Sequence, residues 1–215
     1  MVKKKFQAIF FDNDGLLVDT ESLYLKSSKK ILASVGVEIS EEWYVCENLG
    51  KGKRSFDLAR EKGIPEDQVL KLMKDRDDLY EKMLMENTRI LEGVTEVLEK
   101  LKGKFMMGVV TSSPKNHFDV IMERTNLKRF FDFFITRNDI PEGKPNPELY
   151  LKAIQVSGIP KEQCLVLEDS SRGVQAAKAA GLTCYAIPEP WARAQDFRMA
   201  DRILGSIKEL PEILL

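Results

Sequence analysis

Short apolar runs alternate along the chain with segments in which apolar residues recur every three or four positions. The runs have the length of strands and no polar face, which is typical of strands covered on both sides by helices. They are Phe6–Phe11, Met106–Val110, Phe131–Ile135, Cys164–Leu167 and Cys184–Ile187. The alternation predicts an α/β fold built on a doubly wound parallel sheet, similar to a Rossmann fold.

The segments between these runs have helical periodicity. Helices are expected over Val94–Leu101, Phe118–Thr125, Tyr150–Ile154 and Gly173–Ala180. The last of these is rich in small residues, and Gly181 stands where a helix commonly ends in a left-handed residue. Each predicted helix therefore connects two predicted strands, as a parallel sheet requires.

One region departs from this alternation, because no run between about residues 17 and 87 has the character of a strand. Ser40 has the position of a helix N-cap, and Pro65 begins a longer amphipathic helix. We therefore expect an α/β core formed by residues 1–16 and 88–215, with an inserted all-helical segment, residues 17–87.

The composition argues against several classes of partner. The chain has 215 residues and a net charge of −1, which gives no support for binding to nucleic acid or to a membrane surface. We find no apolar run that could span a membrane and no secretory signal. The cysteines Cys46, Cys164 and Cys184 form no C-x-x-C pair, so neither a disulfide framework nor a zinc site is expected. We expect a cytoplasmic monomer.

Polar residues follow four of the predicted strands, at the point where each strand ends. They are Asp12 and Asp14 after the first strand, Thr111, Ser112 and Ser113 after the second, Lys144 in the loop that follows the third, and Glu168 and Asp169 after the fourth. Because ligands bind beyond the carboxyl ends of the strands in open parallel sheets, we expect all these side chains at one edge.

The chemistry of this group points to a phosphoryl ligand. Four carboxylates cannot all be ionised in one pocket without a counter-charge, and oxygen ligands without histidine or thiolate favour Mg²⁺. The hydroxyl groups of Thr111, Ser112 and Ser113, with backbone amides at a helix start, can bind phosphate oxygens. Two carboxylates also provide two functions: one can attack phosphorus, and the other can transfer the proton.

Four motifs of the sequence resemble those of a known family. The motifs FDNDG, VVTSS, GKPNP and LEDSSRGVQAAKAAG are similar, in order and spacing, to the four motifs of the haloacid dehalogenase-like hydrolases, over nearly the whole chain. The helical segment resembles the cap of the β-phosphoglucomutase-like branch, which controls substrate selectivity. The stretch DGLLVDTE looks most like 2-deoxyglucose-6-phosphatase-like sugar phosphatases.

The resemblance implies a role for each motif residue. Asp12 would be the nucleophile and a metal ligand, and Asp14 the general acid and base, with its backbone carbonyl on the metal. Lys144 would neutralise charge, and Ser112, beside Thr111, would hold phosphate. Asp169 would bind Mg²⁺, with Glu168 binding directly or through water. Other divalent cations such as Mn²⁺ or Co²⁺ are expected to substitute.

A basic stretch outside the strand ends also bears on function. It lies in the helical segment and contains Lys51, Lys53 and Arg54, which are expected either to reach the substrate or to form a solvated turn. The only histidine, His117, is expected at the surface.

We therefore predict a Mg²⁺-dependent phosphatase that hydrolyses small phosphorylated carbohydrates, such as hexose phosphates, through a phospho-Asp12 intermediate. One alternative is a β-phosphoglucomutase-like phosphosugar mutase, although Tyr24 stands where the mutases have a histidine. The other is a phospho-receiver signalling module, which also combines an aspartate, a hydroxyl residue, a lysine and Mg²⁺. Asp14 argues against dehalogenase chemistry, because the dehalogenases of this family lack the second aspartate of the first motif.

Overall fold

Six parallel strands form the central sheet; five of them correspond to the predicted apolar runs, and the sixth, at Arg202–Ile203, was not predicted. In the computed structural model, which describes residues 5–192 and 195–215, the strand order is β5-β4-β1-β6-β7-β8. The strands are β1 (Ala8–Phe11), β4 (Met106–Val110), β5 (Phe133–Ile135), β6 (Cys164–Glu168), β7 (Thr183–Ala186) and β8 (Arg202–Ile203). The predicted fold class is confirmed, and β1 lies at the centre between β4 and β6.

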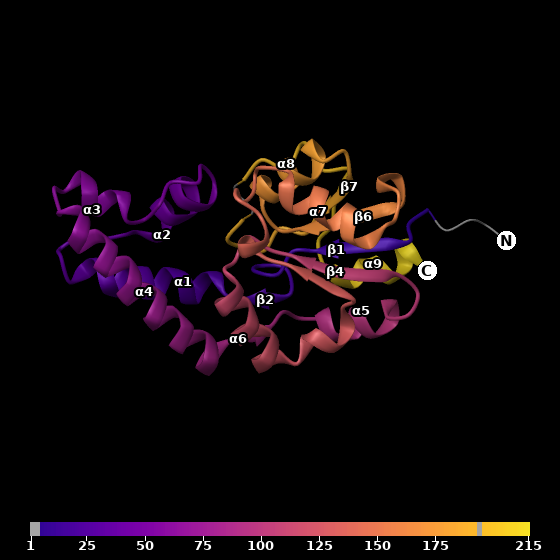
Figure 1. Cartoon of the computed structure of the whole chain (residues 1–215), viewed down its shortest axis with the longest axis horizontal. Coiled ribbons are helices and arrows are strands. Elements are labelled where there is room, and N and C mark those ends of the chain that lie inside the picture. Colours follow the sequence, from indigo (N-terminus) through magenta and orange to yellow (C-terminus); the bar gives the residue numbers. More distant parts are fainter. Residues whose placement is uncertain (1–4, 193–194) are drawn as a thin grey trace.

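Helices cover both faces of the sheet (Figure 1). Side chains of β1 alternate between the two faces, so Ile9 and Phe11 belong to one apolar core, while Ala8 and Phe10 belong to the other. The first core includes residues of α5 (Val94–Leu101), α6 (Lys115–Thr125) and α9 (Leu210–Leu214), and the second includes residues of α7 (Glu148–Ser157) and α8 (Ser171–Ala179). Short 3₁₀ turns complete the connections: η2 (Leu127–Phe130), η3 (Arg137–Asp139), η4 (Lys161–Gln163) and η5 (Ile207–Glu209).

The ends of the elements differ from the prediction by a few residues. The strand expected from Phe131 begins at Phe133, because the amide of Phe131 closes a turn on the carbonyl of Lys128. Gly181 follows α8 with a φ of 76°, and its amide bonds the carbonyl of Lys178. The predicted glycine at the end of this helix is therefore confirmed.

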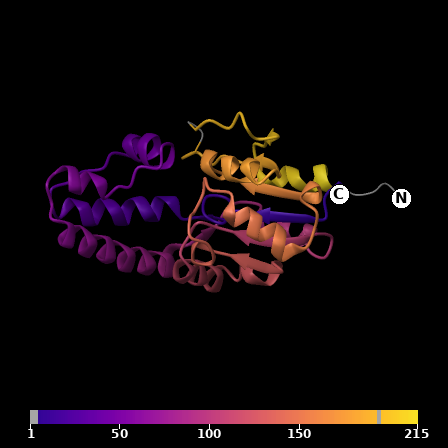
Figure 2. The same cartoon turned by 45° about the horizontal axis from the view of Figure 1, so that its top comes forward.

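A helical segment extends from one end of the sheet (Figure 2). Its elements are α1 (Glu21–Ala33), α2 (Glu41–Trp43), the π-helical turn η1 (Tyr44–Leu49), α3 (Asp57–Glu61) and α4 (Glu66–Asn87). A two-stranded antiparallel ladder of β2 (Val18–Asp19) and β3 (Arg89–Ile90) stands at both ends of the segment. The division at residues 17 and 87 stays a prediction, and residues 1–4 and 193–194 of the predicted core lie outside the described residues.

The segment has an apolar core of its own, formed between its helices. The 22-residue helix α4 buries Val69, Leu72, Tyr80 and Leu84, and the first two belong to this core. Ser40 begins α2 as predicted, because its side chain accepts a hydrogen bond from the amide of Trp43. Within the described ranges, no helix is both long and apolar enough to cross a membrane.

Candidate active site

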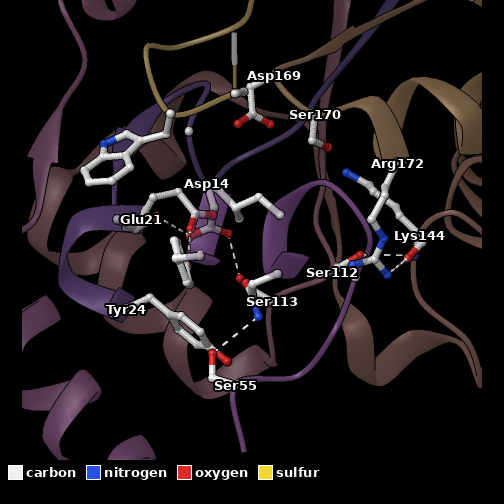
Figure 3. A pocket seen from close by; sticks show the side chains of 18 of the residues that line it. Asp14, Glu21, Tyr24, Ser55, Ser112, Ser113, Lys144, Asp169, Ser170 and Arg172 are labelled. Carbon is white, nitrogen blue, oxygen red and sulfur yellow. Dashed lines mark hydrogen bonds between the residues drawn. The ribbon is translucent and has the colours of Figure 1, made fainter. Parts of the chain in front are cut away.

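The carboxyl ends of three adjacent strands bring the predicted polar residues to one edge of the sheet. Asp12 follows β1, Thr111 follows β4, and Glu168 is the last residue of β6. Because β1 lies between β4 and β6 and all three run parallel, their ends meet. Lys144 reaches the same place from the loop between β5 and α7, and Figure 3 shows it with Asp14 and Asp169 around one cavity.

Lys144 is buried among carboxylates. Its Nζ atom lies 2.5 Å from Oδ1 of Asp12 and 2.6 Å from Oε1 of Glu168, and it donates to the carbonyl of Val110 at 2.9 Å. The Glu168 carboxylate is fully buried and also accepts hydrogen bonds from Tyr150 at 2.5 Å and Ser170 at 3.2 Å. These contacts hold Glu168 in place. Lys144 donates to Oδ1 of Asp12, whereas Oδ2 of Asp12 has no donor among the described residues.

The site has more negative than positive charge. Carboxylate oxygens of Asp12, Glu168 and Asp169 lie within 4.8 Å of one another, and only Lys144 forms ion pairs with them in the described part of the chain. Burial raises the pKa of Asp12 to about 8 and that of Asp169 well above its usual range, with neighbouring carboxylates adding to the shift of both. A divalent cation would offset this cost, so the donor set fits Mg²⁺.

Three hydroxyl groups orient Asp14. Thr20 donates to its Oδ1 at 2.7 Å, while Ser113 and Thr111 donate to its Oδ2 at 2.6 and 3.2 Å. The structure therefore brings Thr111 and Ser113, two of the three predicted phosphate ligands, to the site, where they hydrogen-bond the second aspartate. The hydroxyl oxygen of Ser112 accepts from the backbone amide of Lys144 at 3.2 Å. Their roles as phosphate ligands stay predictions.

Two glycines permit the close approach of the acidic side chains. Gly15 has a φ of 77°, and a Cβ atom there would overlap the carboxylate of Asp169. A Cβ atom at Gly173, in the first turn of α8, would overlap the carboxylate of Glu168. Glycine is therefore required at both positions for a steric reason, and at Gly15 also for a conformational one.

A cavity of about 890 Å³ lies between this edge and the helical segment. Lys53 and Arg54 line it, together with the acids and hydroxyl residues of the sheet edge. Lys51 lies outside the lining residues, and its ammonium group pairs with Glu47 at 2.6 Å on the surface. The structure thus brings Arg54 to the site and directs Lys51 to a surface pair.

The cavity is also lined by residues that the sequence did not single out. Among them are Glu21, Tyr44, Arg76 and Arg172. Arg172 donates to the carbonyl of Lys144 at 2.5 Å. Arg76 lies over the ring of Tyr24 at 4.4 Å, and its Nη1 atom is buried without a partner among the described residues. The sequence could have indicated Glu21, because it directly follows Thr20 in the stretch DTE near the first motif. The positions of Tyr44, Arg76 and Arg172 at the cavity depend on tertiary packing.

The expectation for His117 is wrong. Its side chain is 5% exposed, lines the cavity, and packs edge-on against Tyr80 of α4 with ring centroids 5.1 Å apart. Burial lowers the pKa of this histidine. His117 lies outside the predicted helix Phe118–Thr125, but α4 of the helical segment packs against the first turn of α6, which contains this histidine.

The four motifs thus occupy one charged cavity on a doubly wound sheet, the arrangement of a hydrolase core with a helical segment above it. Residues 9–187 match the family of haloacid dehalogenase-like hydrolases, and the chain belongs to this family. The predicted family resemblance is confirmed.

Individual relatives are similar over most of the chain. A phosphorylated carbohydrates phosphatase of Thermotoga maritima is 29% identical, with 82% of each chain covered. Hexitol phosphatase B of Escherichia coli K12 is 30% identical, covering 96% of this chain and 95% of that protein. The structure of CbbY from Rhodobacter sphaeroides with xylulose-(1,5)bisphosphate superimposes with a TM-score of 0.82 at 25% identity, covering 95% and 96% of the two chains.

Proposed function

We propose that this protein is a Mg²⁺-dependent phosphatase of small phosphorylated carbohydrates. The observation that carries the proposal is the buried pair of Asp12 and Lys144, with Asp14 two residues away in the same cavity. The names of the relatives, a phosphorylated carbohydrates phosphatase and a hexitol phosphatase, support carbohydrate esters as the substrate class.

In the proposed first step, Oδ2 of Asp12 attacks phosphorus. A bond forms between this oxygen and phosphorus, the bond from phosphorus to the ester oxygen breaks, and Asp14 gives its proton to the departing alcohol. In the second step, Asp14 takes a proton from water as the water oxygen attacks phosphorus. The bond to Asp12 then breaks, and inorganic phosphate leaves.

The charged neighbours stabilise this reaction in different ways. Lys144 holds Oδ1 of Asp12, so the other oxygen faces the cavity. Asp12, Asp169 and the backbone carbonyl of Asp14 would hold Mg²⁺, which supplies positive charge for the phosphoryl oxygens. Glu168 would not contact Mg²⁺ directly but would support the residues that do, because its oxygens already accept hydrogen bonds from Tyr150 and Ser170.

The helical segment, residues 17–87, is proposed to act as a cap over the core of residues 1–16 and 88–215. The ladder of β2 and β3 joins the two parts, and the cavity lies between them. Closure over a substrate would exclude bulk water and bring Arg54 to the carbohydrate or to a second phosphate.

Phosphate release from a panel of sugar and polyol phosphates tests the proposal, with Mg²⁺ and with a chelator. We expect hydrolysis that requires the metal and is lost in Asp12→Asn. The proposed phosphatase function is contradicted if wild-type protein releases no phosphate from any ester, or if Asp12→Asn keeps full activity. Isomer formation from a hexose 1-phosphate would indicate the mutase instead, and a phospho-enzyme that lasts for hours would indicate a receiver.

A further inference from the structure

Glu21 is an acid of the cavity that the proposed reaction does not use. It is the first residue of α1, at the junction between the helical segment and the core. Figure 3 shows Glu21 beside Asp14, and the charge of Asp14 contributes to a raised pKa of Glu21. Glu21 therefore faces the region of the cavity where Asp14 would meet the ester oxygen.

The carboxylate of Glu21 has little compensation for its charge. One oxygen accepts a hydrogen bond from the hydroxyl group of Tyr44 at 2.7 Å, and Tyr44 is itself buried and neutral. Among the described residues, Glu21 forms no ion pair, and its other oxygen has no donor. Burial raises the pKa of Glu21 to about 7, and the charges of Asp14 and Asp19 add to the shift.

A partly buried acid without a cation is unfavourable unless a ligand supplies the missing donors. The nearest ligand group follows from the proposed chemistry. Asp14 protonates the ester oxygen, so the carbon atoms of the alcohol begin beside Asp14, and Glu21 is its neighbour. Hydroxyl groups on those carbons are neutral donors, and a hydrogen bond to an ionised carboxylate is stronger than one between neutral groups.

We infer that Glu21 accepts hydrogen bonds from hydroxyl groups of the substrate and thereby selects polyhydroxylated phosphate esters. Tyr44 holds the carboxylate in position through the bond to its other oxygen. The inference rests on the proposed function and extends it, because it names a residue that distinguishes a carbohydrate ester from an ester without hydroxyl groups.

The test compares two substrates across three proteins. The substrates are D-glucitol 6-phosphate, a polyol ester, and p-nitrophenyl phosphate, which has no hydroxyl group. The proteins are wild type, Glu21→Gln, and the control Glu42→Gln, whose residue is exposed in the same segment. We expect Glu21→Gln to reduce kcat/KM for the polyol ester about 10- to 100-fold, mainly through KM. Its kcat/KM for p-nitrophenyl phosphate should stay within about twofold.

Equal losses on both substrates would overturn the inference, because they would indicate a role in chemistry or folding. An unchanged kcat/KM on both would overturn it as well. Tyr44→Phe gives a second variant, which should raise KM for the polyol ester alone, by a smaller factor.

A binding measurement separates this inference from the proposed function. In the Asp12→Asn background, calorimetry compares D-glucitol 6-phosphate with inorganic phosphate, with and without Glu21→Gln. Weaker binding of the polyol ester alone supports the role of Glu21, even if the wild type hydrolyses neither ester and the phosphatase proposal fails. Unchanged binding of the polyol ester overturns the role of Glu21.

Discussion

The ammonium group of Lys144 lies 2.6 Å from Oε1 of Glu168, and neither side chain is more than 7% exposed. This pair joins the loop after β5 to the end of β6. Because Lys144 contacts Asp12 at 2.5 Å as well, one lysine positions two acids that come from different strands. The pair is therefore both part of the proposed chemistry and a support for the fold around it.

Lys144→Met should affect both stability and activity. Removing one partner of a buried ion pair leaves the other charge uncompensated, so the free energy of unfolding should fall by about 3 kcal/mol. Phosphatase activity should fall at least about 100-fold. Urea unfolding and steady-state kinetics measure the two effects. Lys152→Met, an exposed position on α7, is the control, and equal stability of the two variants would contradict the expectation.

Mg²⁺ should stabilise the folded protein. A cation that binds only the folded state at a hundred times its Kd adds about 2.7 kcal/mol, which raises Tm. Asp169→Asn removes a proposed ligand, and the rise on adding Mg²⁺ should then largely disappear. Thermal unfolding in Mg²⁺ and in chelator measures this rise in Tm. The control is Asp119→Asn, at an exposed position on α6. An equal rise in the two variants would remove Asp169 from the proposed metal site.

Gly173→Ala should destabilise the protein although alanine favours helices. The added methyl group would overlap the carboxylate of Glu168, which must then shift away from Lys144. We expect a loss of about 1–3 kcal/mol in the free energy of unfolding, and weaker binding of Mg²⁺. At Gly205, the control, the nearest atom would be Oε1 of Glu209 at 3.4 Å. A neutral or stabilising effect of Gly173→Ala would show that the surrounding helix relaxes.

Glu21 should make stability depend on pH. Its pKa is raised from 4.5 to about 7 by burial, so between these values the folded state binds more protons than the unfolded state. Stability therefore falls as pH rises through this window. Glu21→Gln should remove this term, making the variant up to about 3 kcal/mol more stable relative to wild type at pH 8 than at pH 4. Urea unfolding across this range measures the difference, and parallel pH profiles would contradict it.

Asn13→Leu should stabilise the protein. Both polar atoms of the Asn13 side chain are buried without a partner among the described residues. Leucine has a similar shape and no polar atoms, so the free energy of unfolding should rise by about 1–2 kcal/mol. Chemical denaturation measures the gain, and kinetics show whether Asp12 and Asp14 keep their positions. A loss of stability would indicate that the amide has a polar partner in solution, such as a bound water.

The sequence was sufficient to predict five of the six strands and the convergence of the site, but not the short edge strand β8. Runs such as Ile9–Phe11 and Cys164–Leu167 are buried on both faces, so their apolar composition is a direct signal. Once the strands were placed in parallel, Asp12, Thr111 and Glu168 had to meet at one edge. The ends of the elements were less certain, since turns such as the one at Phe131 depend on local hydrogen bonds.

The sequence by itself determined the fold class and the residue types of the site, because periodicity and strand ends are local properties. Only the tertiary structure decided where side chains point and what they contact. Ser113 binds Asp14 across 99 positions, and Tyr44 reaches Glu21 across 23. His117 is buried because a helix from another part of the chain packs on it. Such contacts depend on how distant elements pack, and their partners are not neighbours in the sequence.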